Sequence, residues 1–593
     1  QGKQIERERR WQASLLRGLL ITSDHLASAI DREKGLHPEI LDVPKLVDFE
    51  DAIKRKELPE GKDLLSYQKK ASETKGNAIL KAPTGAGKTL AAMLWASRNQ
   101  SENGRFYYVL PFTASINAMA RRFIEIFGRE NVGVLHHKNA DFLFRLMEKD
   151  EMSLKLKNQQ AKHLQSLARE MYHPIRISTP HQILRFALRG RGWETGLSEF
   201  VNSCVVYDEV HAFEPLITGL TLATAKLLQS DLFNARILFT SATIPRFLER
   251  LIKENLEIDE SHAIEPNPND EKDAEVTDKK RHKIVIREGN LYDNLPVIVS
   301  EIKASRQSTL IFCNHVKTSQ QVYEKLKEEY DFTDLTLLHS RFNGRDRTEI
   351  EINITLKKSD DEKNKSADLI EKNPLLTPIL VATQAVEVSL DIDYECGYSE
   401  PAPADALGQR LGRVNRKGER PAAKVDIFAE PTNGYLYDQT LTDKTVELLR
   451  AVTAELSEQE LTEIVDKVYE DGYPQDAQDE FEKGLNNRSI KNFSEEMIAG
   501  THVTWTDIIF EKTDAQIDVL PQSLFGEFSM LREQSRFIEA RQLLVPIRWG
   551  QYHKAKAMNA IKYNEKLREH VVTLFYDKKK GLDSDKLDGE NIL

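Results

Sequence analysis

The sequence predicts an α/β protein with two tandem parallel-sheet domains followed by a mostly helical C-terminal domain. Two blocks, residues 63–258 and 285–430, alternate short apolar runs with helical stretches, which is the pattern of βαβ units. After about residue 435 the apolar spacing is mostly helical. The expected strands are 77–82, 106–110, 133–135, 175–178, 203–207 and 235–240 in the first block, and 308–313, 335–338, 378–382, 397–399 and 423–429 in the second.

Two segments rich in charge and proline separate these blocks from their surroundings. Residues 31–62 carry prolines and glycines among charges, and residues 259–284 are poor in apolar side chains, so both are expected to be linkers. The predicted division is 1–30 (an amphipathic helix pair), 31–62 (linker), 63–260 (first α/β domain), 261–284 (linker), 285–435 (second α/β domain) and 436–593 (linker and C-terminal accessory domain). Polar stretches are expected at 138–170 (a helical insertion), at 356–374 and in the charged tail from 578.

The composition indicates a soluble, multidomain protein of the cytoplasm. Its 593 residues predict roughly three to five domains. No apolar run approaches the roughly 18 residues of a membrane span, and no secretory signal is visible. The three cysteines are far apart and are expected to be reduced, buried thiols. The net charge of −11 argues against a wholly basic nucleic-acid coat protein, but a local basic groove can still bind nucleic acid.

A glycine-rich loop between a predicted strand and a predicted helix is the central feature of the sequence. In such a loop the backbone N–H groups cradle a phosphate, and glycine permits the backbone geometry that this requires. Lys88 is expected to reach the β- and γ-phosphates of ATP, and the Thr89 hydroxyl to bind Mg²⁺. The usual first glycine is Ala82 in this chain, and an ordinary strand–turn–helix corner is the alternative. The candidate nucleotide-binding residues are Thr84, Gly85, Ala86, Gly87, Lys88 and Thr89.

Two adjacent carboxylates end a later apolar strand in V-V-Y-D-E-V-H-A-F, residues 205–213. In a parallel sheet they would lie at the carboxyl edge, beside the phosphate loop. Asp208 is expected to hold Mg²⁺, and Glu209 to orient or deprotonate the attacking water. His211 is expected to link this site to the neighbouring domain by a hydrogen bond. The alternative is a solvated acidic turn.

These motifs, in this order over about 350 residues, resemble the motor of superfamily 2 helicases, which has two RecA-like domains. The resemblance implies that Gln68 reads adenine and that Asp391 also contacts the nucleotide. The matching segments are 82–89 (motif I), 208–211 (motif II, of the D-E-x-H type), 241–243 (motif III), 381–393 (motif V) and 409–416 (motif VI).

A cluster of arginines in the second block fits such a two-domain motor. Arg413 and Arg416 are expected to approach the γ-phosphate from the second domain and to stabilise the charge of the transition state. Domain closure would then depend on ATP. A solvated basic helix face or a phosphate-backbone contact is the alternative, most of all for Arg420 and Lys424.

The resemblance also implies which loops contact a nucleic-acid strand. Polar contacts to the backbone of the strand give affinity without reading its sequence, and a purely structural role of these loops is the alternative. The candidates are Pro111, Phe112, Thr113, Thr179, Pro180 and His181 in the first domain, and Asn314, Ser340, Arg341 and Thr383 in the second.

A narrower resemblance is to the CRISPR-associated helicase–nuclease of type I (Cascade) systems. It rests on D-E-V-H-A-F, on L-H-S-R-F at 338–342, on Q-A-V-E-V-S-L-D-I-D and on P-A-P-A-D-A-L-G-Q-R-L-G-R-V-N-R. In that family an HD-type metal nuclease precedes the helicase. The segment 18–28 resembles its later part, and Asp24 matches its final metal ligand. No adjacent His-Asp pair occurs in the sequence, so the HD domain is expected to be largely missing, with residues 1–30 as its remnant or as a docking helix.

The resemblance implies an ATP- and Mg²⁺-dependent DNA helicase that moves along single-stranded DNA in the 3′-to-5′ direction. Its implied partner is an RNA-guided surveillance complex with an opened R-loop, and the motor is expected to be monomeric. A divalent transition metal is expected only if an HD domain is completed, and no nuclease activity is predicted from these residues. The alternatives are an RNA helicase, a restriction-type translocase, and a recruitment subunit whose ATP site only switches its shape.

Overall fold

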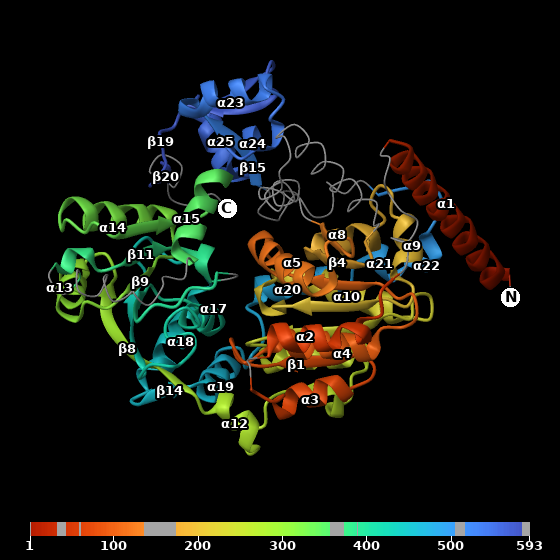
Figure 1. Ribbon diagram of the computed structural model, residues 1–593, viewed down its shortest axis with the longest axis horizontal. Helices are drawn as coiled ribbons and strands as arrows, with labels where there is room; N and C mark the ends of the chain where they lie inside the picture. Colours follow the sequence, from red (N-terminus) through yellow and green to blue (C-terminus); the bar gives the residue numbers. More distant parts are fainter. Residues whose placement is uncertain are drawn as a thin grey trace. The chain divides into compact units, whose positions relative to one another are not determined.

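The computed structural model describes residues 2–32, 43–58, 61–135, 173–355, 370, 373–387, 390–503 and 516–583 (Figure 1). The chain forms two compact units. Unit 1 contains the described residues up to 278 and those from 469 to 503, and unit 2 contains residues 279–468 and 516–583. The predicted insertion at 138–170 and most of the polar stretch at 356–374 lie outside the described residues.

Unit 1 is built on a parallel seven-stranded sheet in the order β3–β4–β2–β5–β6–β1–β7. Its first six strands lie at the six predicted positions, and most of their side chains are buried, which explains their nearly continuous apolar runs. Because the sheet is parallel, the loops after β1 and β5 leave it at the same edge. The strands are β1 (Ala78–Lys81), β2 (Phe106–Val109), β3 (Val132–Leu135), β4 (Ile175–Ser178), β5 (Cys204–Asp208), β6 (Arg236–Ser241) and β7 (Ala263–Ile264).

Helices surround this sheet, and most of them connect one parallel strand to the next. α4 is buried along nearly its whole length, since Leu90 to Ser97 are all inaccessible to solvent. The helices of this part are α2 (Glu50–Glu57), α3 (Ser66–Glu73), α4 (Lys88–Asn99), α5 (Thr113–Phe127), α8 (Pro180–Ala187), α9 (Thr195–Phe200), α10 (Pro215–Gln229), α11 (Arg246–Leu256) and α12 (Glu271–Thr277).

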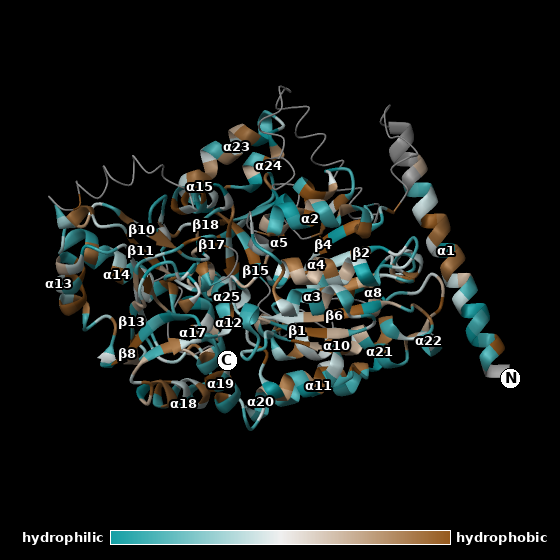
Figure 2. Cartoon of the chain, turned by 60° about the horizontal axis from the view of Figure 1, so that its bottom comes forward, coloured by the Kyte–Doolittle hydropathy of each residue, from teal (hydrophilic) through white to brown (hydrophobic). Residues whose placement is uncertain are grey.

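Two segments from opposite ends of the chain also pack on unit 1. α1 (Gly2–Arg32) is one continuous helix, so the predicted helix pair is wrong, and hydrophobic and hydrophilic patches alternate along it (Figure 2). A Cβ at Gly18 would collide with the backbone of Glu194, which shows how closely α1 approaches α9. α20 (Gln475–Leu485) crosses α10 where Gly219 and Gly484 leave no room for a Cβ. Two short helices, α21 (Arg488–Lys491) and α22 (Phe493–Glu496), follow α20.

Unit 2 contains a second seven-stranded sheet, in the order β10–β11–β9–β12–β13–β8–β14. All of its pairs are parallel except β14 with β8. Five of its strands lie at predicted positions, and the predicted fold class of two parallel-sheet domains is confirmed. The strands are β8 (Lys280–Asn290), β9 (Thr309–Phe312), β10 (Leu335–Leu338), β11 (Ile379–Ala382), β12 (Cys396–Ser399), β13 (Ala423–Glu430) and β14 (Glu455–Ser457).

The segment 261–284, expected as a linker, contains regular structure: β7, α12 and the first residues of β8. β8 lies inside the sheet between β13 and β14, although its sequence K-R-H-K-I-V-I-R-E-G-N is highly charged. The helices of the second α/β part are α13 (Leu295–Ser305), α14 (Val316–Glu328), α15 (Gly344–Thr355), α17 (Ala404–Leu411), α18 (Gln439–Arg450) and α19 (Glu458–Val468).

The C-terminal part of unit 2 has more helical than strand residues, but it also contains a four-stranded sheet that the sequence did not predict. The order of this sheet is β16–β15–β18–β17, and a separate β19–β20 hairpin follows it. Val519, Val545 and Val572 are fully buried in its own small core. The elements are β15 (Gln516–Pro521), α23 (Phe525–Glu533), α24 (Phe537–Arg541), β16 (Val545–Arg548), α25 (Trp549–Ala557), β17 (Ile561–Asn564), β18 (Glu569–Val572), β19 (Tyr576–Asp577) and β20 (Gly581–Leu582).

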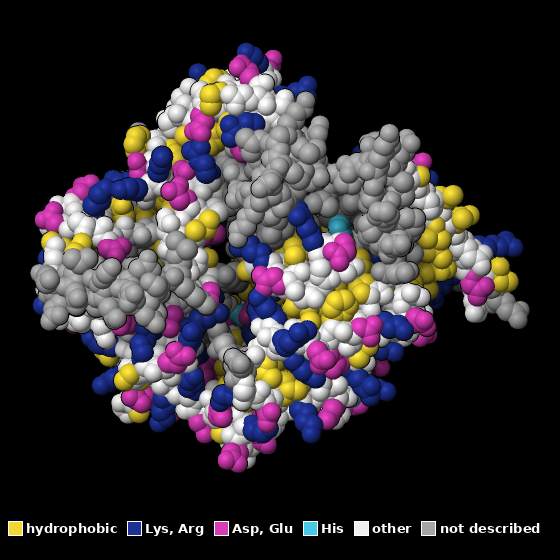
Figure 3. All heavy atoms as spheres, in the orientation of Figure 1, with side chains coloured by type: hydrophobic (Ala, Val, Ile, Leu, Met, Phe, Trp, Pro, Cys, Tyr) yellow, Lys and Arg dark blue, Asp and Glu magenta, His cyan; other side chains and the backbone are white. Residues whose placement is uncertain are grey.

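The described surface is of mixed charge. Lys and Arg side chains are interspersed with Asp and Glu over the face shown in Figure 3. None of the helices in the described part of the chain combines the length and the hydropathy that a membrane span requires.

Candidate functional site

The predicted phosphate-binding loop follows β1 and ends at the first residue of α4, in the strand–loop–helix context that the sequence indicated. Gly85 and Gly87 have φ angles of 85° and 88°, in the left-handed region that favours glycine. The helix starts at Lys88, so the N–H groups of its first turn face the loop and have no partners within the helix. This arrangement has the geometry of the anion-binding sites found at helix N-termini.

Two side chains of α3 support this loop from one side. The Tyr67 hydroxyl donates to the Ala86 carbonyl at 2.5 Å, and Gln68 Nε2 donates to the same carbonyl at 3.2 Å. Gln68 is 3 % exposed, and its Oε1 accepts from the N–H of Leu65. A Cβ at Gly87 would lie 2.5 Å from Gln68 Nε2, so glycine is required there for space as well as for conformation. Gln68, the predicted adenine reader, therefore also fixes the phosphate loop.

Lys88 forms an ion pair with Glu209 at the carboxyl edge of the sheet. Lys88 Nζ lies 2.8 Å from Glu209 Oε1, and the two side chains are 10 % and 26 % exposed. Burial opposes the charge on Glu209, but the Lys88 ammonium group and His211 outweigh it and lower the pKa of Glu209. Glu209 has a φ of 53°, an uncommon backbone conformation for a residue with a side chain, of a kind that clusters at functional sites.

Asp208 and Thr89, the two predicted Mg²⁺ ligands, converge on a third residue. The Tyr108 hydroxyl donates to Asp208 Oδ2 at 2.7 Å, and Thr89 hydrogen-bonds the same hydroxyl. The other oxygen of Asp208 accepts from the N–H of Glu209 at 2.9 Å. Burial and the nearby charge of Glu209 raise the pKa of Asp208. Since carboxylate and hydroxyl oxygens are ligands that Mg²⁺ prefers, the residues present fit that ion.

Tyr108 could not be singled out from the sequence. It lies in β2, beside β5, and is fully buried. Burial is the main cause that raises the pKa of its hydroxyl, and the Asp208 carboxylate raises it further. In the sequence it is one aromatic residue in the run F-Y-Y-V, and nothing distinguishes it there from an ordinary core residue.

His211 connects motif II to motif III inside unit 1. Its Nδ1 hydrogen-bonds the Ser241 hydroxyl, and it lies 3.5 Å from Glu209 Oε2. The Ser241 hydroxyl in turn donates to Glu209 Oε2 at 3.4 Å. Ser241 and Glu209 both belong to this unit, so the expected link from His211 to the neighbouring domain stays a prediction.

The arginines of motif VI lie in unit 2 and differ in their surroundings. Arg413 is 6 % exposed, and its guanidinium group donates to the backbone carbonyls of Val386 and Glu387 at 2.7 and 2.6 Å. Arg416 is 26 % exposed and lies 3.5 Å from the carboxylate of Asp391, which is 70 % exposed. Arg416 also donates from Nη1 to the carbonyl of Leu390 at 3.1 Å. Both predicted γ-phosphate arginines therefore contact the motif V backbone, and Arg416 is the one that solvent reaches more readily.

Arg410, which belongs to the basic cluster of the sequence but was given no role of its own there, organises the interior of this region. Its Nε pairs with Glu387 Oε1 at 2.8 Å, and its Nη2 donates to Asn314 Oδ1 at 2.9 Å. It is 2 % exposed and also lies over the ring of Tyr437. A buried charge needs such partners, and the spacing of the motif does not show which of its arginines has them.

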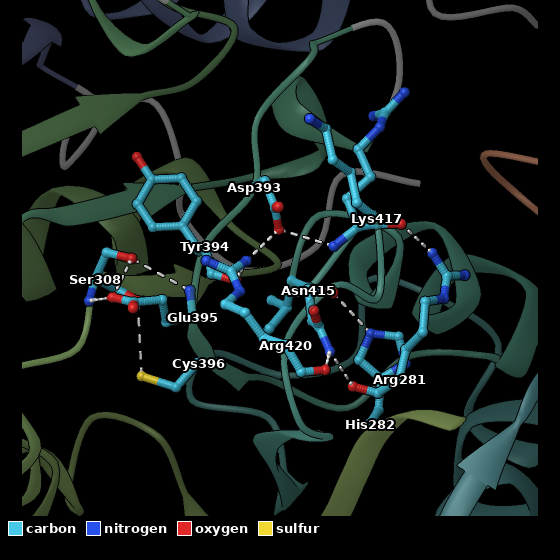
Figure 4. Close-up of polar contacts among 12 residues, drawn as sticks. Arg281, His282, Ser308, Asp393, Tyr394, Glu395, Cys396, Asn415, Lys417 and Arg420 are labelled. Atoms are coloured by element: carbon cyan, nitrogen blue, oxygen red, sulfur yellow. Dashed lines mark hydrogen bonds and ion pairs between the residues drawn. The ribbon is translucent and has the colours of Figure 1, made fainter. Parts of the chain in front are cut away.

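The loop that carries Arg416 is anchored by β8 (Figure 4). Asn415 has a φ of 46° and donates from Nδ2 to the carbonyl of Arg281, while the ring of neutral His282 donates from Nε2 to the carbonyl of Val414 at 2.8 Å. Burial and the charge of Arg281 lower the pKa of His282 to about 4. Asp393 accepts hydrogen bonds from the N–H of Arg416 and from Arg420, which are two of the contacts drawn in Figure 4.

The predicted nucleic-acid contacts are found in different environments. Phe112 and Ser340 are exposed, and Pro111, Thr179 and His181 are partly buried, with burial lowering the pKa of His181. The side chain of Thr113 lies outside the described residues. Pro180, Asn314, Arg341 and Thr383 are buried, and the β19–β20 hairpin covers Arg341 through a hydrogen bond from the Leu582 N–H to its carbonyl. The structure therefore presents only part of the predicted set to solvent.

Asp24, the predicted metal ligand, is exposed on α1. Among the described residues, no group of three or more His, Cys, Asp or Glu side chains is arranged to hold a metal ion.

Comparisons with known proteins agree with this geometry. Residues 65–251 match the family model of the DEAD/DEAH box helicases, and residues 305–419 match that of the CRISPR-associated nuclease/helicase Cas3, C-terminal. A Cas3-type nuclease/helicase of Methanocaldococcus jannaschii is 28 % identical over 505 residues, which are 81 % of this chain and 64 % of that protein. The CRISPR-associated endonuclease/helicase Cas3 of Escherichia coli (strain K12) is 28 % identical over 397 residues, 58 % of this chain and 42 % of its own length. The chain thus spans less than two thirds of the length of these relatives.

Solved structures show the same fold. T. fusca Cas3 with AMPPNP has a TM-score of 0.65 at 19 % identity, covering 92 % of this chain and 72 % of that one. T. fusca Cas3 with ATP gives 0.66 at 18 % identity, covering 90 % and 71 %. A chain of a "CRISPR RNA-guided surveillance complex, pre-nicking" gives 0.55 at 18 % identity, covering 86 % and 68 %.

The fold, with its two parallel-sheet domains, and the matched segment 65–251 therefore make the chain similar to the DEAD/DEAH box helicases. The predicted resemblance to the CRISPR-associated helicase–nucleases is confirmed, because the chain is similar to Cas3 proteins.

Proposed function

We propose that this chain is an ATP-dependent helicase that translocates along single-stranded DNA in type I CRISPR interference. The Lys88–Glu209 pair carries the proposal, because it brings a phosphate-binding lysine and a water-activating carboxylate together at one sheet edge. The matches to DEAD/DEAH box helicases and to Cas3 support it.

ATP hydrolysis in this proposal begins with an exchange of partners at Lys88. The γ-phosphate competes with Glu209 for the ammonium group, and Glu209, once released, can orient or deprotonate the attacking water. Ser241 and His211 remain on the second oxygen of Glu209 and hold its carboxylate in place. The first turn of α4 and the N–H groups of residues 84–89 would bind the phosphates.

Mg²⁺ would be held by Thr89 and Asp208, and when bound it neutralises charge on the phosphates. Asp208 is kept in position by Tyr108 and by the N–H of Glu209.

From unit 2, Arg416 would contribute the charge that stabilises the transition state, because it is more exposed than Arg413. Arg413 would hold the motif V backbone beside it. Such an arginine makes closure of the two domains depend on ATP, and repeated closure moves the strand.

The partner in this proposal is an RNA-guided surveillance complex at an opened R-loop in the cytoplasm, where a single motor would unwind the target. Degradation of the DNA falls to an HD nuclease acting with the motor. The similarity to a chain of a surveillance complex supports the choice of partner.

Displacement of a labelled strand from a partial duplex tests the proposal. We expect ATP-dependent displacement from a substrate with a single-stranded DNA overhang, and no displacement by Lys88→Ala. Stronger stimulation of ATP hydrolysis by single-stranded RNA than by DNA would favour an RNA helicase instead. A Glu209→Gln variant that still unwinds, together with a Lys88→Ala variant that fails only to join the surveillance complex, would favour an ATP-operated switch.

A further inference from the structure

A row of contacting rings runs across the C-terminal sheet and α25. The ring centroids of Trp549 and Tyr552 are 5.2 Å apart, those of Tyr552 and His570 are 5.0 Å apart, and those of His570 and Tyr563 are also 5.0 Å apart. His570 and Tyr563 are direct cross-strand partners on β18 and β17. We call these four side chains, with His553 stacked on Trp549 at 5.6 Å, the aromatic row.

Both ends of the aromatic row are open to solvent. Trp549 is 43 % exposed and Tyr563 is 54 % exposed, whereas Tyr552 between them is buried. A Cβ built at Gly550, directly after Trp549, would meet no atom within 4 Å. The exposed part of such a ring is an apolar surface on which a partner can stack.

The segment that carries the aromatic row has a net charge opposite to that of the whole chain. Residues 545–572 contain six Lys or Arg and two Glu, a net charge of +4, whereas the chain carries −11. Burial lowers the pKa of His570, and the positive charge of nearby Lys556 lowers it further.

We propose that the aromatic row is a binding site for single-stranded DNA, with bases stacked on Trp549 and Tyr563 and phosphates facing Lys556. Exposed rings among basic side chains are the combination that binds single strands without reading their sequence. A duplex keeps its base faces stacked on one another, so the row selects an unpaired strand. The site would hold the strand outside the motor loops, and this inference rests on the proposed DNA helicase function.

Gly550 offers a test that leaves the rings intact. It is the second residue of α25, and Gly526 is the second residue of α23, where a Cβ also meets no atom within 4 Å. A Glu at either position suits the N-terminal turn of a helix. We therefore expect Gly550→Glu to weaken binding of fluorescent oligo(dT) to the full chain, Gly550→Lys to strengthen it, and Gly526→Glu to leave it unchanged in fluorescence anisotropy.

Removal of the rings gives the second measurement. Stacking of a base on an aromatic side chain predicts a loss of about five-fold or more in affinity for Trp549→Ala with Tyr563→Ala. Phe575→Ala is the matched control, because Phe575 is 67 % exposed in the same part of the chain but lies outside the row. Quenching of tryptophan fluorescence by oligo(dT) should be reduced in Trp549→Phe, which keeps an aromatic side chain at this position.

The outcomes separate this inference from the proposed function. If the wild type binds no oligo(dT), both fail. The aromatic-row site alone fails if the wild type binds oligo(dT) and unwinds DNA but two variant results are negative. These results are that Gly550→Glu binds oligo(dT) as tightly as Gly526→Glu, and that the double alanine variant binds within two-fold of the wild type. The row would then serve another partner, such as a protein. If the double alanine variant does not fold, the Gly550 and Trp549→Phe measurements decide.

Discussion

Glu209→Gln tests the exchange of partners at Lys88. In the structure Glu209 Oε1 lies 2.8 Å from Lys88 Nζ, the group to which ATP would bind in the proposed function. The direct Coulomb attraction of such a pair is about 6 kcal/mol at an effective dielectric constant of about 20. Desolvation and side-chain ordering offset most of it, and the 26 % exposure of Glu209 places the pair between surface and buried cases. We take the net contribution of the pair as about 1–2 kcal/mol, and therefore expect Glu209→Gln to bind ATP about 5- to 30-fold more tightly while losing hydrolysis.

Titration of a fluorescent ATP analogue in the absence of DNA measures this effect. A simpler explanation of tighter binding is that the variant removes repulsion between Glu209 and the phosphates. A double-mutant cycle separates the two. If the gain arises through Lys88, Glu209→Gln has little effect in a Lys88→Met background. An equal gain in that background, or no gain in the wild-type background, would refute the competition for Lys88.

Further substitutions test the other parts of the site. Arg416→Ala should bind ATP normally but lose roughly 10³- to 10⁵-fold in the hydrolysis rate. Comparable turnover by Arg416→Ala and the wild type would contradict the role of Arg416 at the γ-phosphate. Arg413→Ala should lower the melting temperature, because it removes the donors to the carbonyls of Val386 and Glu387. Gly87→Ala should weaken ATP binding, because its Cβ would lie 2.5 Å from Gln68 Nε2 in a left-handed turn; an unchanged dissociation constant would show that the loop tolerates the shift. Tyr108→Phe should lower the free energy of unfolding by about 1–3 kcal/mol and raise the Mg²⁺ concentration needed for hydrolysis, and a change in stability alone would make the hydroxyl merely structural.

Most strands of the two large sheets could be predicted because each is a short apolar run beside a turn. β8 could not, since it lies at the end of a charged segment and its lysines and arginines point outward or pair with neighbouring carboxylates. The C-terminal sheet could not be predicted either. Its strands are four to six residues long and several are polar, so their period-2 pattern is too short to distinguish from helical spacing.

The residues of the candidate site also fall into those that the sequence could place and those that it could not. Lys88, Thr89, Asp208 and Glu209 could be placed from the sequence because each belongs to a motif with a fixed position in the chain. Tyr108 and Arg410 could not, because their roles depend on which strand lies beside which. A buried tyrosine in β2 becomes a ligand-positioning residue only once β2 is known to pair with β5. The same limit applies to Asn314, whose amide is bonded inside the protein.

Steady-state ATP hydrolysis with and without single-stranded DNA is the sharpest test of whether this chain is a DNA-driven motor. We expect oligo(dT) to stimulate hydrolysis by the full chain, duplex DNA without single-stranded ends to stimulate it less, and Lys88→Ala and Arg416→Ala both to abolish the stimulated rate. Hydrolysis that is indifferent to DNA, or stimulated hydrolysis that survives in either variant, would contradict a motor that couples ATP in this site to movement on a single strand.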